Sequence, residues 1–259
     1  VDQAAEAAAS SEAAAIARHG ELRPGQQEVV AYRPGRRSLY GIATAGVVGL
    51  ALYGALDVPR FGESLELETT RWEAAAAGER FITALGFDVG DHLTSSRFSS
   101  SLGSDHFTHL IRAAGIERAD SLAAARTHPW RWALRWFRDQ EKEEFHVEVG
   151  PAGKVVSFNH LIAESASGPQ WPADSARVAV EAFVGDRFGV ELADSSSYRL
   201  LEATEDRLEA RLDHNFVWET TADKIIEEGE FRTVARLQGD EPAGLDVWYK
   251  APEEFLREL

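Results

Sequence analysis

The longest hydrophobic stretch of the chain lies near its N-terminus. Residues 39–56 read LYGIATAGVVGLALYGAL and contain no charged side chain. As an α-helix, this stretch would rise roughly 27 Å, close to the ~30 Å hydrocarbon thickness of a bilayer. Tyr40 and Tyr53 lie near its two ends, where amphipathic rings favour the membrane interface. The pattern predicts a transmembrane helix over residues 38–58, and the alternative is a glycine-rich helix buried in a soluble domain.

The charges on the two sides of this stretch differ. Arginines precede it, and acidic residues predominate after it: Arg33, Arg36 and Arg37 on one side, and Asp57, Arg60, Glu63, Glu66 and Glu68 on the other. Because Lys and Arg are retained on the cytoplasmic side, we expect a cytoplasmic N-terminus and extracytoplasmic residues 60–259. A leader of 38 residues is long for a cleaved signal peptide, which favours an uncleaved anchor. Gly41, Ala45 and Gly49 form a stripe of small residues suited to close contact with another helix.

Residues 1–37 have a different composition. This segment is rich in Ala, Glu and Ser, poor in aromatic residues, and interrupted at Pro24-Gly25 and Pro34-Gly35. Its five acidic and five basic side chains cancel. We therefore predict a cytoplasmic low-complexity tail, in which a frayed helix is followed by a linker; a small docking helix is the alternative.

Beyond the apolar stretch, the pattern indicates two similar halves, residues 60–165 and 170–259. Thr70 and Glu73 have the spacing of a capping box, which predicts a helix that starts near Arg71 and ends at Gly86. The sequence Leu85-Gly86-Phe87-Asp88-Val89 at its end is matched in residue type, 103 residues later, by Phe188-Gly189-Val190-Glu191-Leu192, which follows a second predicted helix over residues 176–188. This repetition predicts an internal duplication.

Strand-like blocks follow each predicted helix. They are residues 130–136, 144–149 and 154–158 in the first half, and residues 208–218, 230–237 and 245–249 in the second, with turns at 150–153 and 239–244. Strict alternation of apolar and polar residues in two of these blocks is typical of an antiparallel sheet with one buried face. An insert over residues 92–128 predicts two short helices and, at residues 94–101, a short strand or loop. We expect an α+β fold: a single N-terminal transmembrane helix followed by a duplicated helix-plus-antiparallel-sheet region.

The charge and the cysteine content exclude several classes of function. The chain of 259 residues carries 43 acidic and 27 basic side chains, a formal net charge of −16. This balance argues against a protein that tracks nucleic-acid phosphates, which needs a basic face. The chain has no cysteine, so disulfides, thiolate metal sites and cysteine nucleophiles are excluded. It also has no Gly-x-Ser-x-Gly, Gly-x-Gly-x-x-Gly or P-loop motif, which leaves nucleotide chemistry without a phosphate cradle.

Few residues are candidates for chemistry. His106 and His109, next to Asp105, could present two nitrogens to a metal from one side of a helix, but this spacing without a third ligand is more typical of a helix start capped by Asp105 with exposed imidazoles. The stripe of Trp130, Trp132 and Trp136 could bind a sugar or a peptide, but at a spacing of two it is more typical of a core. His146 is expected on the solvated face of its strand. The string from Glu227-Glu228 to Arg232 lies in a charged turn and lacks an apolar helix around it.

The pattern of aromatic residues and turns resembles a known family. The segment from Trp130 to His160, together with the later blocks 213–219, 238–240 and 249–255, is similar to the extracytoplasmic region of bacterial CPBP (CAAX-processing and bacteriocin-processing) intramembrane metalloproteases. In that family, an N-terminal anchor precedes a duplicated PepSY-like domain, and a multi-pass protease domain follows. The resemblance implies a bacterial cell-membrane protein and covers residues 38–259.

The resemblance carries no catalytic residue into this chain. The Glu-Glu-x-x-x-Arg and paired-histidine motifs of the family belong on apolar helices, which would follow residue 259, and zinc is implied only for that domain. One transmembrane span cannot enclose a water-filled metal site in lipid. The first hypothesis is therefore a non-catalytic anchor and regulatory or substrate-binding region of such a hydrolase. Its partners would be membrane lipid, its own protease domain or another membrane protein, and a peptide or protein substrate, but no nucleic acid. The alternatives are a complete single-pass protein that binds a partner or inhibits an enzyme, and a soluble metal-binding protein that uses Asp105, His106 and His109.

Overall fold

The structure, a computed structural model, describes residues 35–56, 60–62, 65–101, 104–221 and 229–258. The chain divides into two units, residues 1–58 and residues 59–259. The predicted tail over residues 1–37 therefore lies outside the described residues except for its last three positions. The two units are described separately.

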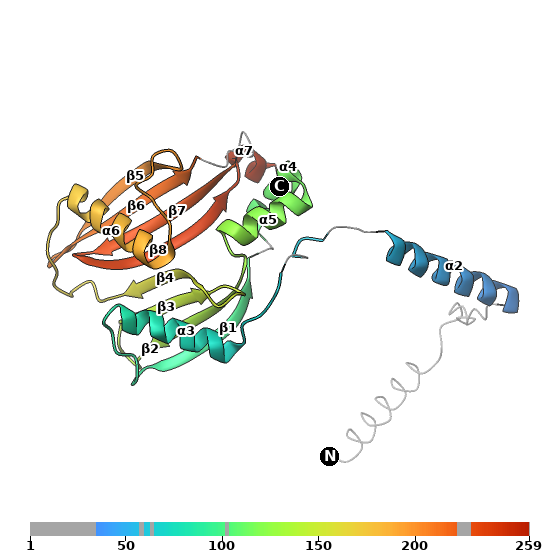
Figure 1. The fold of residues 1–259 in the computed structure, drawn as a ribbon, viewed down its shortest axis with the longest axis horizontal. Coiled ribbons are helices and arrows are strands. Elements are labelled where there is room, and N and C mark those ends of the chain that lie inside the picture. The colour runs from blue at the N-terminus through green and yellow to red at the C-terminus, as the bar shows by residue number, and fades with distance from the viewer. Residues whose placement is uncertain (1–34, 57–59, 63–64, 102–103, 222–228, 259) are drawn as a thin grey trace, which may run out of the picture. The chain divides into compact units, whose positions relative to one another are not determined.

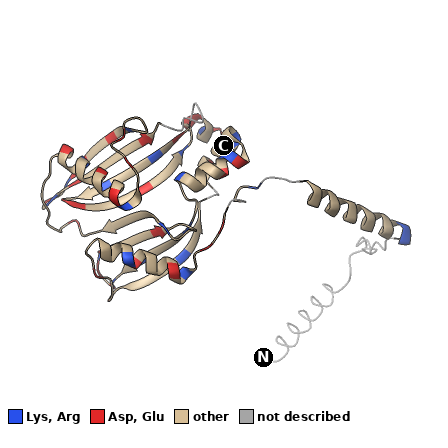
Figure 2. Ribbon diagram, viewed as in Figure 1, with Lys and Arg blue, Asp and Glu red and all other residues tan. Residues whose placement is uncertain are grey.

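The described part of the first unit is one helix, α2, over Arg36–Ala55. It has a mean hydropathy of 1.4 and no buried residue, and it is long and apolar enough to cross a membrane. Figure 2 shows charged residues only at its first turn. The predicted apolar helix is confirmed, and none of its residues is buried.

The second unit is built on one eight-stranded antiparallel sheet with the strand order β1-β2-β3-β4-β8-β7-β6-β5 (Figure 1). The strands are β1 (Leu93–Ser100), β2 (Trp130–Phe137), β3 (Glu144–Val149), β4 (Val155–Leu161), β5 (Tyr198–Arg207), β6 (Leu212–Thr220), β7 (Glu230–Gln238) and β8 (Glu241–Lys250). The expected α+β class is confirmed. The segments predicted as two halves each supply four strands and one helix that packs on them, and they share this one sheet.

Two helices cover the same face of the sheet, which we call the helix face. The first, α3 (Arg71–Ala84), packs on the first four strands, and the second, α6 (Ala173–Phe188), packs on the last four (Figure 1). The predicted capping box is present: the Thr70 backbone N–H donates to the Glu73 carboxylate at 2.8 Å. The chain leaves the two helices through Gly86 (φ 98°) and Gly189 (φ 71°), as the repeated pattern predicted.

The core lies between these helices and the alternating residues of the strands. The predicted tryptophan stripe belongs to it: Trp136 is 3 % exposed, and Trp132 packs against the same cluster. On the opposite face, charged side chains pair across strands, for example Arg131 with Glu148 at 2.9 Å. His146 lies on this second face, where it contacts Glu144, so its predicted solvated position is confirmed.

The two sets of four strands meet at a short junction between β4 and β8. Register pairs join the two strands at Phe158↔Leu245 and at Asn159↔Gly244. One residue further, the Ser157 hydroxyl donates to the Leu245 carbonyl at 2.9 Å. Gly244 fits closely here: a Cβ atom at this position would lie 2.9 Å from the Arg236 side chain and 3.2 Å from the Phe158 carbonyl oxygen. The strands diverge beyond the junction toward the start of β4.

A helical hairpin in the β1–β2 connection occupies this diverging end. It consists of α4 (Asp105–Ala114) and α5 (Ile116–Arg126), and Phe107 and Leu110 on α4 pack with Phe231 and Tyr249 of β7 and β8. The short helix α7 (Glu253–Arg257) follows β8 and packs on α4. A segment of the first half thus covers strands of the second half. The two predicted short helices are confirmed.

The strand predictions were wrong at two places. The predicted strand over 208–218 begins in the turn that follows β5, so β5 was missed and β6 starts four residues later, at Leu212. The predicted turn over 239–244 is shorter, because β8 already starts at Glu241. β5 is an edge strand, and its second half is exposed on both faces, so its sequence does not alternate. The predicted strands 130–136, 144–149 and 230–237 are confirmed.

Gly78 sets the distance between α3 and the sheet. A Cβ atom at this position would lie 2.5 Å from the buried Trp136 ring. We expect Gly78→Ala to lower the midpoint of thermal unfolding, because overpacking costs about 1–3 kcal/mol, more than the roughly 1 kcal/mol that Ala gains in helix propensity. The control is Gly185→Ala in α6, where the nearest atom would be at 3.6 Å and only the propensity gain is expected. A Gly78→Ala variant as stable as Gly185→Ala would contradict this packing.

Candidate functional site

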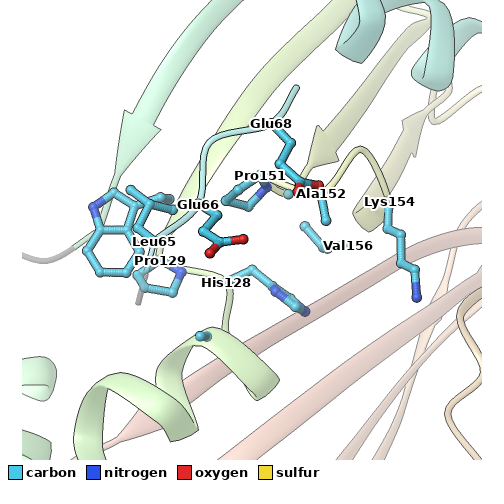
Figure 3. Close-up of a pocket in the computed structure, with 12 residues that line it drawn as sticks. Leu65, Glu66, Glu68, His128, Pro129, Pro151, Ala152, Lys154 and Val156 are labelled. Atoms are coloured by element: carbon cyan, nitrogen blue, oxygen red, sulfur yellow. The ribbon is translucent and has the colours of Figure 1, made fainter. Parts of the chain in front are cut away.

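Two adjoining cavities lie on the helix face, where the end of α5 meets the start of β4. The first, which we call the linker pocket, has a volume of about 300 Å³. Its walls come from residues 65–68, which lead from α2 toward α3, from the end of α5, and from the turn before β4 (Figure 3). Glu66, His128 and Lys154 bring ionisable groups to it.

The second cavity, which we call the basic pocket, has a volume of about 340 Å³. It shares His128, Lys154 and Val156 with the linker pocket, so the two cavities are neighbours. Its remaining walls come from the end of α6 and from β5 to β8. His128 therefore lines both cavities, of which the linker pocket also contains Glu66 and Glu68 and the basic pocket also contains Arg126.

Local backbone structure places His128 at this point. The last turn of α5 ends when the backbone N–H groups of Thr127 and His128 both donate to the Ala123 carbonyl. His128 then adopts φ 46°, a left-handed conformation that is uncommon for residues with a side chain. Pro129 prevents the helix from continuing. The imidazole is thus held at the helix end by a conformation that costs of order 1–3 kcal/mol.

The surroundings of His128 favour its neutral form. Burial lowers the pKa of His128 below the ordinary 6.5, and the nearby charges of Arg131 and Lys154 lower this pKa further. Because two cations and partial burial both oppose protonation, the imidazole is neutral at pH 7. A neutral imidazole offers one hydrogen-bond donor and one acceptor to a ligand.

The structure places the sequence candidates elsewhere. His106 Nδ1 accepts from the Ala251 backbone N–H at 3.0 Å, and His109 Nδ1 lies 2.9 Å from the Tyr249 hydroxyl. His109 is 7 % exposed, so the expectation that both imidazoles are exposed is wrong; α4 turns it into the apolar cluster with Tyr249. Burial raises the pKa of Tyr249 to about 12, which keeps its hydroxyl protonated. Asp105 starts α4, but Ser104 is the N-cap residue.

These residues do not fit the zinc that the family resemblance implies for a following domain. Among the described residues, no three His, Asp or Glu side chains form a group that could hold a metal ion. The nitrogens of His106 and His109 that are described above already contact protein groups. Glu227 and Glu228 lie outside the described residues.

Sequence reasoning missed the residues that line the two cavities. His128 and Lys154 are separated by a strand pair and a turn, so no spacing in the sequence joins them. One local signal was present: a histidine directly before Pro129 at the predicted end of a helix must leave the helical conformation. Nothing in the sequence indicated that residues 65–68 would form a wall of the same cavity.

Comparisons with known proteins give no relative for this chain. No family model matches it, and no curated protein or solved structure does so either.

We predict that His128→Asn makes stability less dependent on pH. An unfolded histidine binds a proton near pH 6.5, whereas folded His128 has a lower pKa; stability is therefore lost as the pH falls below 6.5 toward the folded-state pKa. Asn tolerates the left-handed backbone and does not titrate. Thermal unfolding between pH 5 and pH 8 should show a smaller loss at acid pH than in the unsubstituted protein. Equal losses in both proteins would contradict the assignment.

A second variant tests why the pKa of His128 is lowered. Lys154→Gln removes one of the two cations that lower the pKa of His128. The pKa of His128, followed by the NMR signal of its ring Cε1 proton, should therefore rise. The other charged groups of the two cavities, Arg126, Glu66 and Glu68, are unchanged in this variant.

Proposed function

We propose that this chain is a membrane-tethered binding and regulatory module, the non-catalytic front region of an intramembrane protease of the CPBP type. In this proposal, α2 is the anchor, residues 60–259 lie outside the cytoplasm, and the PepSY-like duplication provides the sheet. Peptide-bond hydrolysis would belong to zinc-binding helices of a further domain. The described residues bind and regulate and carry no step of the hydrolysis.

One observation carries the regulatory part of the proposal. The linker pocket is walled by Leu65, Glu66 and Glu68, which lie on the path from α2 to α3. Thr69 then fixes this path to the sheet, because its backbone N–H donates to the Pro151 carbonyl and its carbonyl accepts from the Trp132 indole. A ligand in the pocket would touch the segment that leads to the anchor, so its binding would bias that segment's conformation.

The repeated order of elements supports the family assignment. In each half a helix that packs on the sheet precedes four strands, α3 and α6 lie on one face, and each of the two is followed by a glycine of positive φ. This arrangement is expected if a unit of one helix and four strands was duplicated and the two copies pair through β4 and β8. The first half also contains the hairpin of α4 and α5 between β1 and β2, and the second half ends in α7. The apolar, fully exposed α2 supports membrane anchoring.

The alternative function is that of a complete single-pass protein whose outer domain binds a partner or inhibits an enzyme. The two functions differ in what the natural reading frame encodes after Leu259. Apolar segments that carry paired glutamates and histidines would support the protease, whereas an immediate stop codon would support the alternative.

The absence of cysteine allows a direct test of the orientation. We predict that Ser195→Cys, an exposed position in the second unit, reacts with a membrane-impermeant maleimide in intact bacterial cells. Ser10→Cys should react only after the membrane is permeabilised. The opposite labelling would reverse the predicted topology, and recovery of the full chain in the soluble fraction would contradict the anchor.

A further inference from the structure

The basic pocket differs in charge from the rest of the chain. The protein has a net charge of −16, yet none of the described residues that line this cavity is an Asp or a Glu. Arg126, His128 and Lys154 line it instead. The neighbouring linker pocket, in contrast, contains Glu66 and Glu68. The positive lining is therefore a local property of the basic pocket, and it favours an anionic ligand.

Hydroxyl groups form a second part of the lining. Thr220 and Thr233 are 6 % and 2 % exposed, and both face the cavity from the central strands β6 and β7. Thr233 differs from its neighbours on the same face of β7, Phe231 and Ala235, which are apolar core residues. A hydroxyl group among apolar residues at the wall of a cavity can donate a hydrogen bond to a ligand.

Tyr198 adds a third hydroxyl at the edge strand. Arg126 Nη1 lies 3.4 Å from its oxygen, which holds the guanidinium and the phenol on the same side of the cavity. The donors thus come from three directions: α5 with its following residue, the start of β4, and strands β5 to β7. This distribution places donors on several sides of a small acceptor group.

The remaining walls are apolar. Val155 and Val156 on β4 and Leu245 and Val247 on β8 line the cavity at the place where these strands diverge. A volume of about 340 Å³ is at the small end of ligand pockets. The cavity therefore fits an anionic head with a short apolar body, and a fully hydrated inorganic anion would leave the valine and leucine walls without contact.

We propose that the basic pocket binds a carboxylate that is attached to a small apolar group. Two sources share this chemistry: the free C-terminus of a peptide with an apolar last residue, and a free small carboxylic acid. Lys154 and Arg126 provide the charge, the Thr233 hydroxyl donates to a carboxylate oxygen, and the apolar body contacts Val156 and Leu245. The inference deepens the sensing role proposed above, but binding itself depends neither on the membrane orientation nor on a following protease domain.

The test is calorimetric titration of the full chain in detergent micelles with pairs of matched ligands. N-acetyl-L-leucine should bind and its neutral amide should bind at least about tenfold more weakly, because the amide loses the charge-assisted hydrogen bonds. The dipeptide N-acetyl-Ala-Leu, as acid and as amide, separates the two sources: a stronger dipeptide acid indicates a peptide C-terminus, and a stronger single residue indicates a free acid. Inorganic phosphate is the third probe.

Variants connect the binding to the pocket. Lys154→Gln, at an exposed position, and Thr233→Val, which keeps the side-chain shape, should each weaken the binding of the acid about tenfold. Lys142→Gln removes the same charge from the exposed β2–β3 loop and should leave binding unchanged. Thermal unfolding checks that the Thr233→Val variant is folded. If it is not, the binding of the acid by the Lys154→Gln variant decides whether the pocket is the binding site.

Four results would overturn the proposal. These are equal binding of acid and amide, phosphate that binds as tightly as N-acetyl-L-leucine, equal weakening by Lys142→Gln and Lys154→Gln, and no saturable binding of any carboxylate at millimolar concentrations. Reversed labelling of the cysteine variants would overturn the membrane orientation while leaving this binding intact, so the two failures are distinguishable.

Discussion

The short pairing between β4 and β8 is the constraint on which the rest of the second unit depends. Strand pairing at Phe158↔Leu245 and Asn159↔Gly244 makes one sheet of eight strands, and it keeps α3 and α6 on one face because successive residues of a strand alternate between faces. The same pairing stops after two positions. The end of α5 and both cavities occupy the diverging end, so a longer β4–β8 ladder would remove the candidate site.

Contacts outside the ladder compensate for its shortness. The hairpin of α4 and α5 belongs to the first half by sequence, yet its apolar face covers Phe231 and Tyr249 of the second. At the other end of the junction, the buried imidazole of His160 lies 3.0 Å from Glu143 of the first half and 3.0 Å from Glu241 of the second. The halves therefore cannot separate without exposing an apolar cluster and breaking the contact between His160 and Glu241, which favours unfolding of residues 59–259 as one cooperative unit.

The sequence allowed the local structure to be predicted better than the way in which its parts combine. The capping box of Thr70 and Glu73, the alternation in residues 144–149 and the glycine at each helix end are local signals, and each predicted its element. β5 was missed because an edge strand with two solvated faces has no alternation. The cavities were missed because they depend on the β4–β8 register, which joins residues 87 positions apart and leaves no trace in a single sequence.

The electrostatic interaction of a bound anion with this protein depends mainly on the charged groups nearest to it. Residues beyond position 37 hold 38 acidic and 22 basic side chains, an excess that on its own repels anions. Salt reduces this repulsion beyond roughly 8 Å at physiological ionic strength, whereas groups that line a partly closed cavity are screened much less. Arg126 and Lys154 lie in the wall of the basic pocket and therefore act on a bound anion more strongly than the carboxylates beyond that wall. The depressed pKa of His128 follows mainly from burial, and the nearby cations Arg131 and Lys154 lower this pKa further, so the many carboxylates of the chain do not raise it.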